Sequence, residues 1–223
     1  MKTEDAIRAR RTLKLRVDPQ HPLPLTKGED FKKQIQAMIE LAGQAPFHHQ
    51  SHEHYHSKGL LKGVEPWRFH ALDGESCRKL LASLNEDKPV KCSDGIKEML
   101  AAADALIMVS WLPERTPRLK KGSFYPNVKN MEHIAATGAA IQNLLLAATA
   151  KGITNYWSSG GCLRKPAILE TLGVSDEELL LGAVFLFPDE YNEDVVKTKT
   201  GKNRESRGHV SDWMDWLQVD SGG

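Results

Sequence analysis

The segment from about Asn130 to Lys151 limits the possible folds more than any other part of the chain. It has the pattern of one long helix, and Gly152 is placed to end it. A helix that is apolar all round belongs in the interior of a protein. The first half of this helix consists largely of small residues, which let another backbone approach closely: Ala135, Ala136, Gly138, Ala139 and Ala140. We therefore expect a central helix, packed on all sides.

The remaining patterns predict an α+β chain. The continuous apolar runs Ala105 to Trp111 and Leu179 to Phe187 have the length of buried strands, and Trp67 to Ala71 alternates like a half-buried one. Apolar periodicity and end signals predict further helices at Glu4 to Arg10, Phe31 to Ala42, Cys77 to Leu84, Pro166 to Leu172, and through Val210, Trp213, Met214 and Leu217. Because strands and helices do not alternate strictly, a doubly wound sheet is disfavoured. We expect a single domain over residues 1–223.

The charge balance argues against partners that are bound through a general electrostatic field. Lys plus Arg number 30 and Asp plus Glu 29, a net charge of +1, so we expect neither a nucleic-acid nor a membrane partner. No run approaches the roughly 20 apolar residues of a membrane span, and the charged N-terminus lacks the apolar core of a secretory signal. The chain is therefore expected to be cytoplasmic. Its cysteines, Cys77, Cys92 and Cys162, show no CxxC spacing and are expected to be reduced.

A basic segment near the N-terminus is the first candidate binding site. Arg8, Arg10, Arg11 and Lys14 surround the hydroxyl of Thr12. Arginine presents a planar fork of donors that matches phosphate oxygens two at a time. The alternative interpretation is a solvated basic end of a short helix, which the helix dipole favours.

Three later segments could contribute to the same kind of site. They are Ala45-Pro46-Phe47-His48 with Glu65-Pro66-Trp67-Arg68-Phe69, the loop Tyr156-Trp157-Ser158-Ser159-Gly160-Gly161, and Lys202-Asn203-Arg204. The loop offers small residues and backbone amides that can approach a flat polar ring. Each segment also has an ordinary structural interpretation, respectively a core tryptophan, a strand with its turn, and a surface turn. No GxGxxG follows a strand, so a nicotinamide cofactor would not be held in a Rossmann turn.

Taken in this order, the motifs resemble those of the nitroreductase family. Arg10-Arg11-Thr12 is similar to the family's Arg-Arg-Ser segment, and Glu65-Pro66-Trp67-Arg68-Phe69 to its Gln-Pro-Trp-x-Phe segment. The helix from Gly138 to Ala148, with Gln142-Asn143-Leu144-Leu145-Leu146, is the most specific match. Gly152 to Trp157 and the late pair Lys202 and Arg204 complete a resemblance that spans nearly the whole chain.

The resemblance implies an intertwined homodimer whose central mixed or antiparallel sheet is flanked by helices, with two non-covalent FMN sites at the interface. Arg10, Thr12, Lys14 and Arg204 would hold the FMN phosphate, and His48, Trp157, Ser158 and Ser159 would lie near the flavin. Arg11, Pro66, Trp67 and Lys202 complete the candidate cofactor-binding set. The implied function is an FMN oxidoreductase that moves electrons from NADH or NADPH to a small electron-poor acceptor, such as a nitroaromatic or a quinone, by a ping-pong mechanism. Because the cofactor performs the redox step, no catalytic side chain is nominated.

Three departures from the family pattern stand out. Thr12 replaces a serine, Glu65 stands where glutamine is usual, and an insert at about 48–64 replaces a short turn. The insert region carries His48, His49, His52, His54 and His56, and imidazole is a common ligand of zinc, copper and nickel. We expect a polar lid or dimer-contact loop without a metal. A His-cluster metal-binding protein and a non-catalytic flavin-binding family member remain the alternatives.

Overall fold

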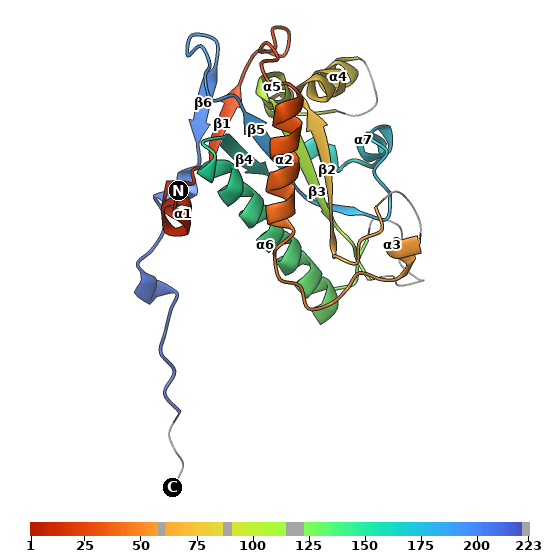
Figure 1. Cartoon of the computed structure of the whole chain (residues 1–223), viewed down its shortest axis with the longest axis vertical. Coiled ribbons are helices and arrows are strands. Elements are labelled where there is room, and N and C mark those ends of the chain that lie inside the picture. The colour runs from red at the N-terminus through yellow and green to blue at the C-terminus, as the bar shows by residue number, and fades with distance from the viewer. Residues whose placement is uncertain (58–60, 87–90, 115–122, 220–223) are drawn as a thin grey trace.

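A computed structural model of the chain describes residues 1–57, 61–86, 91–114 and 123–219 (Figure 1). Residues 58–60 of the expected insert and 220–223 of the expected domain lie outside these ranges. The helices are α1 (Thr3–Ala9), α2 (Glu29–Ala42), α3 (His54–Ser57), α4 (Gly74–Asn85), α5 (Asp94–Ala102), α6 (Val128–Ala150) and α7 (Pro166–Thr171). The strands are β1 (Leu13–Arg16), β2 (Trp67–Asp73), β3 (Ala105–Trp111), β4 (Thr154–Ser158), β5 (Leu179–Phe187) and β6 (Lys197–Thr200). Short 3₁₀ turns are η1 (Gly161–Arg164), η2 (Lys202–Arg204) and η3 (Val210–Asp212).

A four-stranded antiparallel sheet forms the centre of the molecule, in the order β2-β3-β5-β4. Strands β3 and β5 are the inner pair, which explains why their sequences are continuous apolar runs without alternation: both faces of these strands are covered. The α+β prediction and the antiparallel central sheet are confirmed.

Helices cover both faces of this sheet. On one face α2 and α6 pack side by side, and Met38, Ile141 and Leu144 meet Ile107 and Val184 of the inner strands. On the other face lie α4, α5 and α7 with η1, and this larger cluster surrounds Phe185 and Leu106. The expected helices at both faces are confirmed within a few residues, but α5 was not expected from the sequence.

The long helix α6 has the ends that the sequence predicts. Asn127 caps its first turn, because its side chain accepts a hydrogen bond from the Asn130 amide at 2.8 Å. Gly152 has φ +78°, which permits the left-handed turn that ends the helix. The expectation that α6 is packed on all sides is wrong for a single chain, since Met131 and Ala135 are exposed on one side.

A second, two-stranded sheet joins the two ends of the chain. Strand β1 pairs with β6 in antiparallel register, with Leu13 opposite Thr200 and Arg16 opposite Lys197. The Gly201 amide then extends the pairing by donating to the Thr12 carbonyl at 3.0 Å. Strand β6 is polar throughout. Strand β1 alternates Leu13 and Leu15 with Lys14 and Arg16, but this run of four residues is at the short end of the strand pattern.

Two further expectations are wrong. The segment through Val210, Trp213 and Met214 forms only the turn η3 and no amphipathic helix, because its own chain offers no apolar surface against which to fold. Trp213 and Trp216 are 72% and 82% exposed. Cys92 and Cys162 form a disulfide instead of remaining reduced, because the fold brings the start of α5 beside η1, whereas Cys77 is buried and free.

None of the helices in the described ranges has both the length and the apolar composition needed to cross a bilayer.

Asp104 provides a test of the core electrostatics. It lies between α5 and β3, is 4% exposed, and its Oδ2 atom has no hydrogen-bond partner within the described residues. Burial raises the pKa of this carboxyl above its usual range, although Lys27 and Arg78 act in the opposite direction. Because the folded-state pKa lies above the unfolded one, the ionised form is disfavoured by folding, and the penalty grows as the pH rises above about 4.

We expect Asp104→Asn to raise the free energy of unfolding at pH 7 by about 1 kcal/mol, because the neutral amide has the shape of the carboxyl group but no charge to desolvate. The gain should shrink as the pH falls towards 4, as measured by urea denaturation at several pH values. The exposed Asp30→Asn is the control and should show no such trend. A variant that is less stable than the wild type at pH 7 would contradict this description of Asp104.

Candidate functional site

A cluster of arginines forms where the two ends of the chain meet. Arg10 follows α1, and Arg204 lies in η2 directly after β6. Arg204 donates from Nη1 to the Arg10 carbonyl at 2.9 Å and from Nη2 to the Arg8 carbonyl at 3.0 Å. Pairing of β1 with β6 therefore places two predicted phosphate ligands together although they lie 194 residues apart in the sequence.

The charges in this cluster are not balanced by acidic side chains. Partial burial lowers the pKa of Arg10, and the neighbouring charges of Arg204, Arg207 and Arg11 lower it further. Among the residues that the structure describes, none of these four arginines forms an ion pair with a carboxylate. A bound anion would relieve this repulsion, so the cluster has the electrostatics of an anion-binding site.

Thr12, directly before β1, and Lys14 within it add a hydroxyl and an ammonium group beside the paired strands. Thr12 packs closely on Gly201, where an added Cβ atom would lie 2.9 Å from the Thr12 Cβ atom. The Lys14 Nζ atom lies 4.4 Å from the centre of the Tyr156 ring on β4. The Arg11 Nη1 atom instead donates to carbonyls at the end of α1, at 3.0 Å from Ala9, so its guanidinium is engaged in capping that helix.

The loop after β4 follows a strand that packs against β1. Ser158 is buried, and its Oγ atom accepts a hydrogen bond from the Gly160 amide at 3.2 Å. Ser159 is exposed. Gly160 and Gly161 have φ of +100° and +52°, conformations that side chains rarely adopt. The predicted loop is thus a glycine turn in which Ser159 and Gly161 are exposed and Gly160 is buried.

Trp157 lies on the opposite face of β4. Its indole covers Gly182 of β5, and an added Cβ atom there would collide with the Trp157 Nε1 atom at 2.0 Å. The ring is 38% exposed. Trp157 therefore packs over the pairing of β4 with β5, and part of its side chain remains exposed.

The other predicted residues lie at the opposite end of α6. The His48 Nδ1 atom is 3.5 Å from Glu132 Oε1 in the first turns of that helix. Trp67 is buried against Ala136 and Ala140, and Pro66 precedes it. Arg11 of the arginine cluster instead lines a small pocket together with Thr149, at the C-terminal end of α6. At ~1.5 Å per residue, Glu132 and Thr149 are about 25 Å apart, so a single chain does not bring the two groups together.

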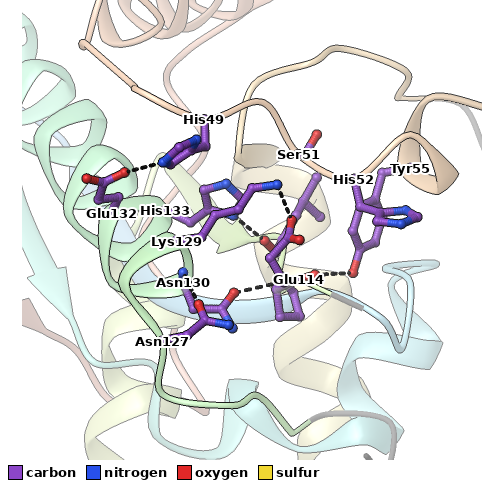
Figure 2. Close-up of polar contacts among 12 residues, drawn as sticks. His49, Ser51, His52, Tyr55, Glu114, Asn127, Lys129, Asn130, Glu132 and His133 are labelled. Carbon is purple, nitrogen blue, oxygen red and sulfur yellow. Dashed lines mark hydrogen bonds and ion pairs between the residues drawn. The ribbon is translucent and has the colours of Figure 1, made fainter. Parts of the chain in front are cut away.

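The His-rich insert is attached to this same N-terminal end of α6 (Figure 2). The Tyr55 hydroxyl donates to the Pro113 carbonyl at 2.9 Å, and His49 Nε2 lies 2.9 Å from Glu132 Oε2. The Asn130 side chain holds the segment after β3 by accepting from the Glu114 amide at 2.8 Å. In the described part of the chain, no group of three or more His, Cys, Asp or Glu side chains converges as a metal site would require.

Several residues of these regions belong to no motif that the sequence analysis could recognise. Arg207 and Gly201 belong to the arginine cluster, and their closeness to Lys202 and Arg204 was the only available indication. Glu65 replaces the family's glutamine and lies near the buried guanidinium of Arg68. Burial lowers the pKa of Arg68, and the negative charges of Glu178 and Glu65 partly offset this effect. That pairing becomes visible only in the tertiary structure.

The structure is an α+β fold with a cluster of arginines at one edge of its antiparallel sheet. The family model for "Nitroreductase family" matches residues 7–186. The chain belongs to the nitroreductase family.

Individual relatives agree with this assignment. The chain is 28% identical over 205 residues to a Bacillus subtilis (strain 168) protein named "Putative NAD(P)H nitroreductase YfhC", with 88% of each covered. Among solved structures, a nitroreductase-like family protein from Bacillus cereus has a TM-score of 0.65 at 21% identity and covers 98% of this chain and 97% of its own. A Desulfovibrio desulfuricans protein described as a "putative nitroreductase in complex with fmn" has a TM-score of 0.56 at 17% identity, with 98% of each chain covered. These structures share the fold.

Gly201 tests how the site is assembled. We expect Gly201→Ala to displace Thr12 and to weaken the pairing of β1 with β6, at a cost of about 1–3 kcal/mol, as for overpacking elsewhere. The backbone φ of −77° is open to any residue, so the effect is steric alone. Hydrogen exchange should show faster exchange of the amides in β1 and β6. Gly28→Ala, where nothing lies within 4 Å, is the control; equal protection in both variants would show that Gly201 does not hold the strands together.

Proposed function

We propose that this protein is an FMN-dependent oxidoreductase that transfers electrons from NAD(P)H to a small electron-poor acceptor. The observation that carries the proposal is the arginine cluster, because Arg10 and its neighbours are packed together without an acidic partner among the described residues. A phosphate would supply the missing negative charge. The structural relative from Desulfovibrio desulfuricans holds FMN, and the Bacillus subtilis relative carries an NAD(P)H nitroreductase name.

The residues present fit this cofactor. Arg10 and Arg204 would bind the phosphate with the Thr12 hydroxyl and Lys14, while the glycine turn at Ser159 and Gly160 would present backbone to the polar edge of the ring. When bound, FMN supplies the hydride- and electron-transfer chemistry. The role of the chain is to bind and orient the cofactor and to limit access to it, so no side-chain nucleophile is required.

We further propose that the active form is a homodimer, since the predicted site is split within one chain. A second copy of the chain is needed to bring the region of His48 and Trp67 from one subunit to the arginine cluster of the other. Two surfaces are suited to that contact. One is the exposed side of α6 with Met131 and Ala135; the other is the C-terminal segment with Trp213 and Trp216. Large exposed aromatic side chains of this kind mark interaction surfaces.

The spectrum of the purified protein tests the cofactor assignment. We expect a yellow protein with the absorption of oxidised flavin, which bleaches when NADH or NADPH is added without oxygen and recovers on addition of a quinone. A yellow protein that neither nucleotide bleaches would instead be a non-catalytic flavin-binding member of the family. A colourless protein that does not bind added FMN would refute the proposal.

The phosphate contacts are tested by comparing two flavins. A hydrogen bond to a charged partner contributes roughly 1.5–3 kcal/mol, so Arg10→Ala and Arg204→Ala should each weaken FMN binding by about ten- to a hundredfold. Riboflavin, which lacks the phosphate, should bind the wild type weakly and should be nearly indifferent to either substitution. Fluorescence titration of the apoprotein measures both affinities.

Lys33→Ala, which removes one positive charge on the distant α2, is the matched control and should leave both affinities unchanged. Because the Arg204 guanidinium also binds two backbone carbonyls, its loss could disturb the local fold; that effect would weaken both flavins alike. Unchanged FMN affinity in folded Arg10→Ala and Arg204→Ala would place the phosphate elsewhere.

The dimer is tested by mass and by removal of the C-terminal segment. Light scattering at micromolar concentration should give about twice the chain mass of 24.9 kDa. Deleting the residues after Gly208 should shift the protein towards the monomer, because it removes the exposed Trp213 and Trp216. A full-length monomer that binds FMN tightly would contradict the shared site.

A further inference from the structure

A cavity of about 600 Å³ opens at the β2 edge of the sheet, away from the arginine cluster at the β4 edge. We propose that it is a binding site for an uncharged or cationic aromatic molecule that carries hydroxyl or amino groups. Its volume lies within the range of small-molecule sites, ~300–1,000 Å³.

The cavity is built from four separate parts of the chain. Strand β2 contributes His70 and Leu72, and the His-rich insert contributes His54, Tyr55 and Leu61. The remaining wall comes from Leu112 after β3 and from the segment between α7 and β5, which includes Leu172, Glu177 and Glu178. The insert, which has no counterpart in the family pattern, thus forms one wall of a cavity that a shorter turn would leave open.

Two imidazole–carboxylate pairs hold these parts in place. His54 Nε2 lies 2.7 Å from Glu177 Oε2, and His70 Nε2 lies 2.7 Å from Glu178 Oε2. An ionised carboxylate can only accept, so each Nε2 atom carries the donated proton. The pairs connect segments that are 123 and 108 residues apart in the sequence, and they fix the insert and β2 against the same loop.

Glu178 is positioned to accept a further hydrogen bond. It is 9% exposed, and its Oε2 atom also accepts a hydrogen bond from the Ser110 hydroxyl. A carboxylate has about four lone-pair positions, so its second oxygen keeps accepting capacity for a ligand. Ser110 donates to the carboxylate and not to an imidazole, which argues against a nucleophilic serine here.

The polar groups select the charge of the ligand. The Arg68 guanidinium is occupied by backbone, because it donates to the carbonyls of Gly63, Glu65 and Trp67 at 2.8–3.0 Å. Arg68 is also only 6% exposed, so little of its guanidinium is open to an anion. With both histidines neutral, the two carboxylates of Glu177 and Glu178 outweigh the single positive charge of Arg68, so the lining is negative by one charge and disfavours carboxylates and phosphates.

The apolar groups select the body of the ligand. Leu61, Leu72, Leu112 and Leu172 also line the cavity. A molecule that fills such a space has an apolar, preferably planar, body and presents donors at one end. Phenols and aromatic amines meet both requirements, whereas a benzoate of the same size presents a negative charge to Glu178.

Three probes of similar size test the inference: tyramine, phenol and benzoate, titrated into the full-length protein by calorimetry and saturation-transfer NMR. We expect saturable binding of tyramine, weaker binding of phenol, and binding of benzoate at least tenfold weaker than that of tyramine. Glu178→Gln should weaken tyramine binding by about tenfold or more, since it removes the charged acceptor. Leu172→Trp should abolish binding of tyramine and phenol by filling the cavity.

His49→Ala is the matched control, because it removes another imidazole–carboxylate pair of the same insert, with Glu132, outside the cavity. It should leave tyramine affinity unchanged, and circular dichroism melts should confirm that each variant is folded. Benzoate binding as tightly as tyramine, equal tyramine binding in folded Leu172→Trp, or no saturable binding of tyramine or phenol would overturn the proposal. These titrations need no flavin, so their outcome is independent of the function proposed above.

Discussion

The structure depends on the burial of α6 against the antiparallel sheet. Ala140, Ile141, Leu144 and Ala148 are buried on its inner face, and burial of apolar surface is the main favourable term in folding, roughly 25 cal/mol per Å². Because α6 is long and straight, its ends fix two distant regions of the molecule. The arginine cluster attaches near its C-terminal end, and the His-rich insert attaches near its N-terminal end (Figure 1).

The electrostatics of the two edges of the sheet differ for a simple reason. At the β4 edge, Arg10, Arg204 and Arg207 are close together and lack acidic partners among the described residues, so positive charge is left for a ligand to neutralise. At the β2 edge, Arg68 is satisfied by carbonyls and the carboxylates face imidazoles. One chain of nearly neutral net charge therefore carries an unpaired arginine cluster at one edge and a cavity lined by two carboxylates at the other. Local placement decides this difference, since the total charge is only +1.

The sequence revealed most of the core because the core is repetitive. The helices α2 and α6 and the strands β3 and β5 follow apolar periods that a few neighbouring residues are enough to establish, and the family motifs placed Arg10, Thr12, Ser158 and Arg204 in one candidate site. The sequence did not reveal α5, β1 or β6, which are short or polar. It also misjudged the C-terminal segment: an amphipathic pattern forms a helix only where a surface receives its apolar face, and Trp213 has none in its own chain.

By itself, the sequence determined the α+β class, the long capped helix, the buried strands and the family, because each depends on local periodicity or on a motif read in order. Only the tertiary structure decided which distant residues meet. Pairing of β1 with β6 brings Arg10 to Arg204, folding of the insert brings His54 to Glu177, and the approach of α5 to η1 joins Cys92 to Cys162. These contacts arise from the register and packing of whole elements, and a hydrogen bond between residues more than a hundred positions apart leaves no period in the sequence.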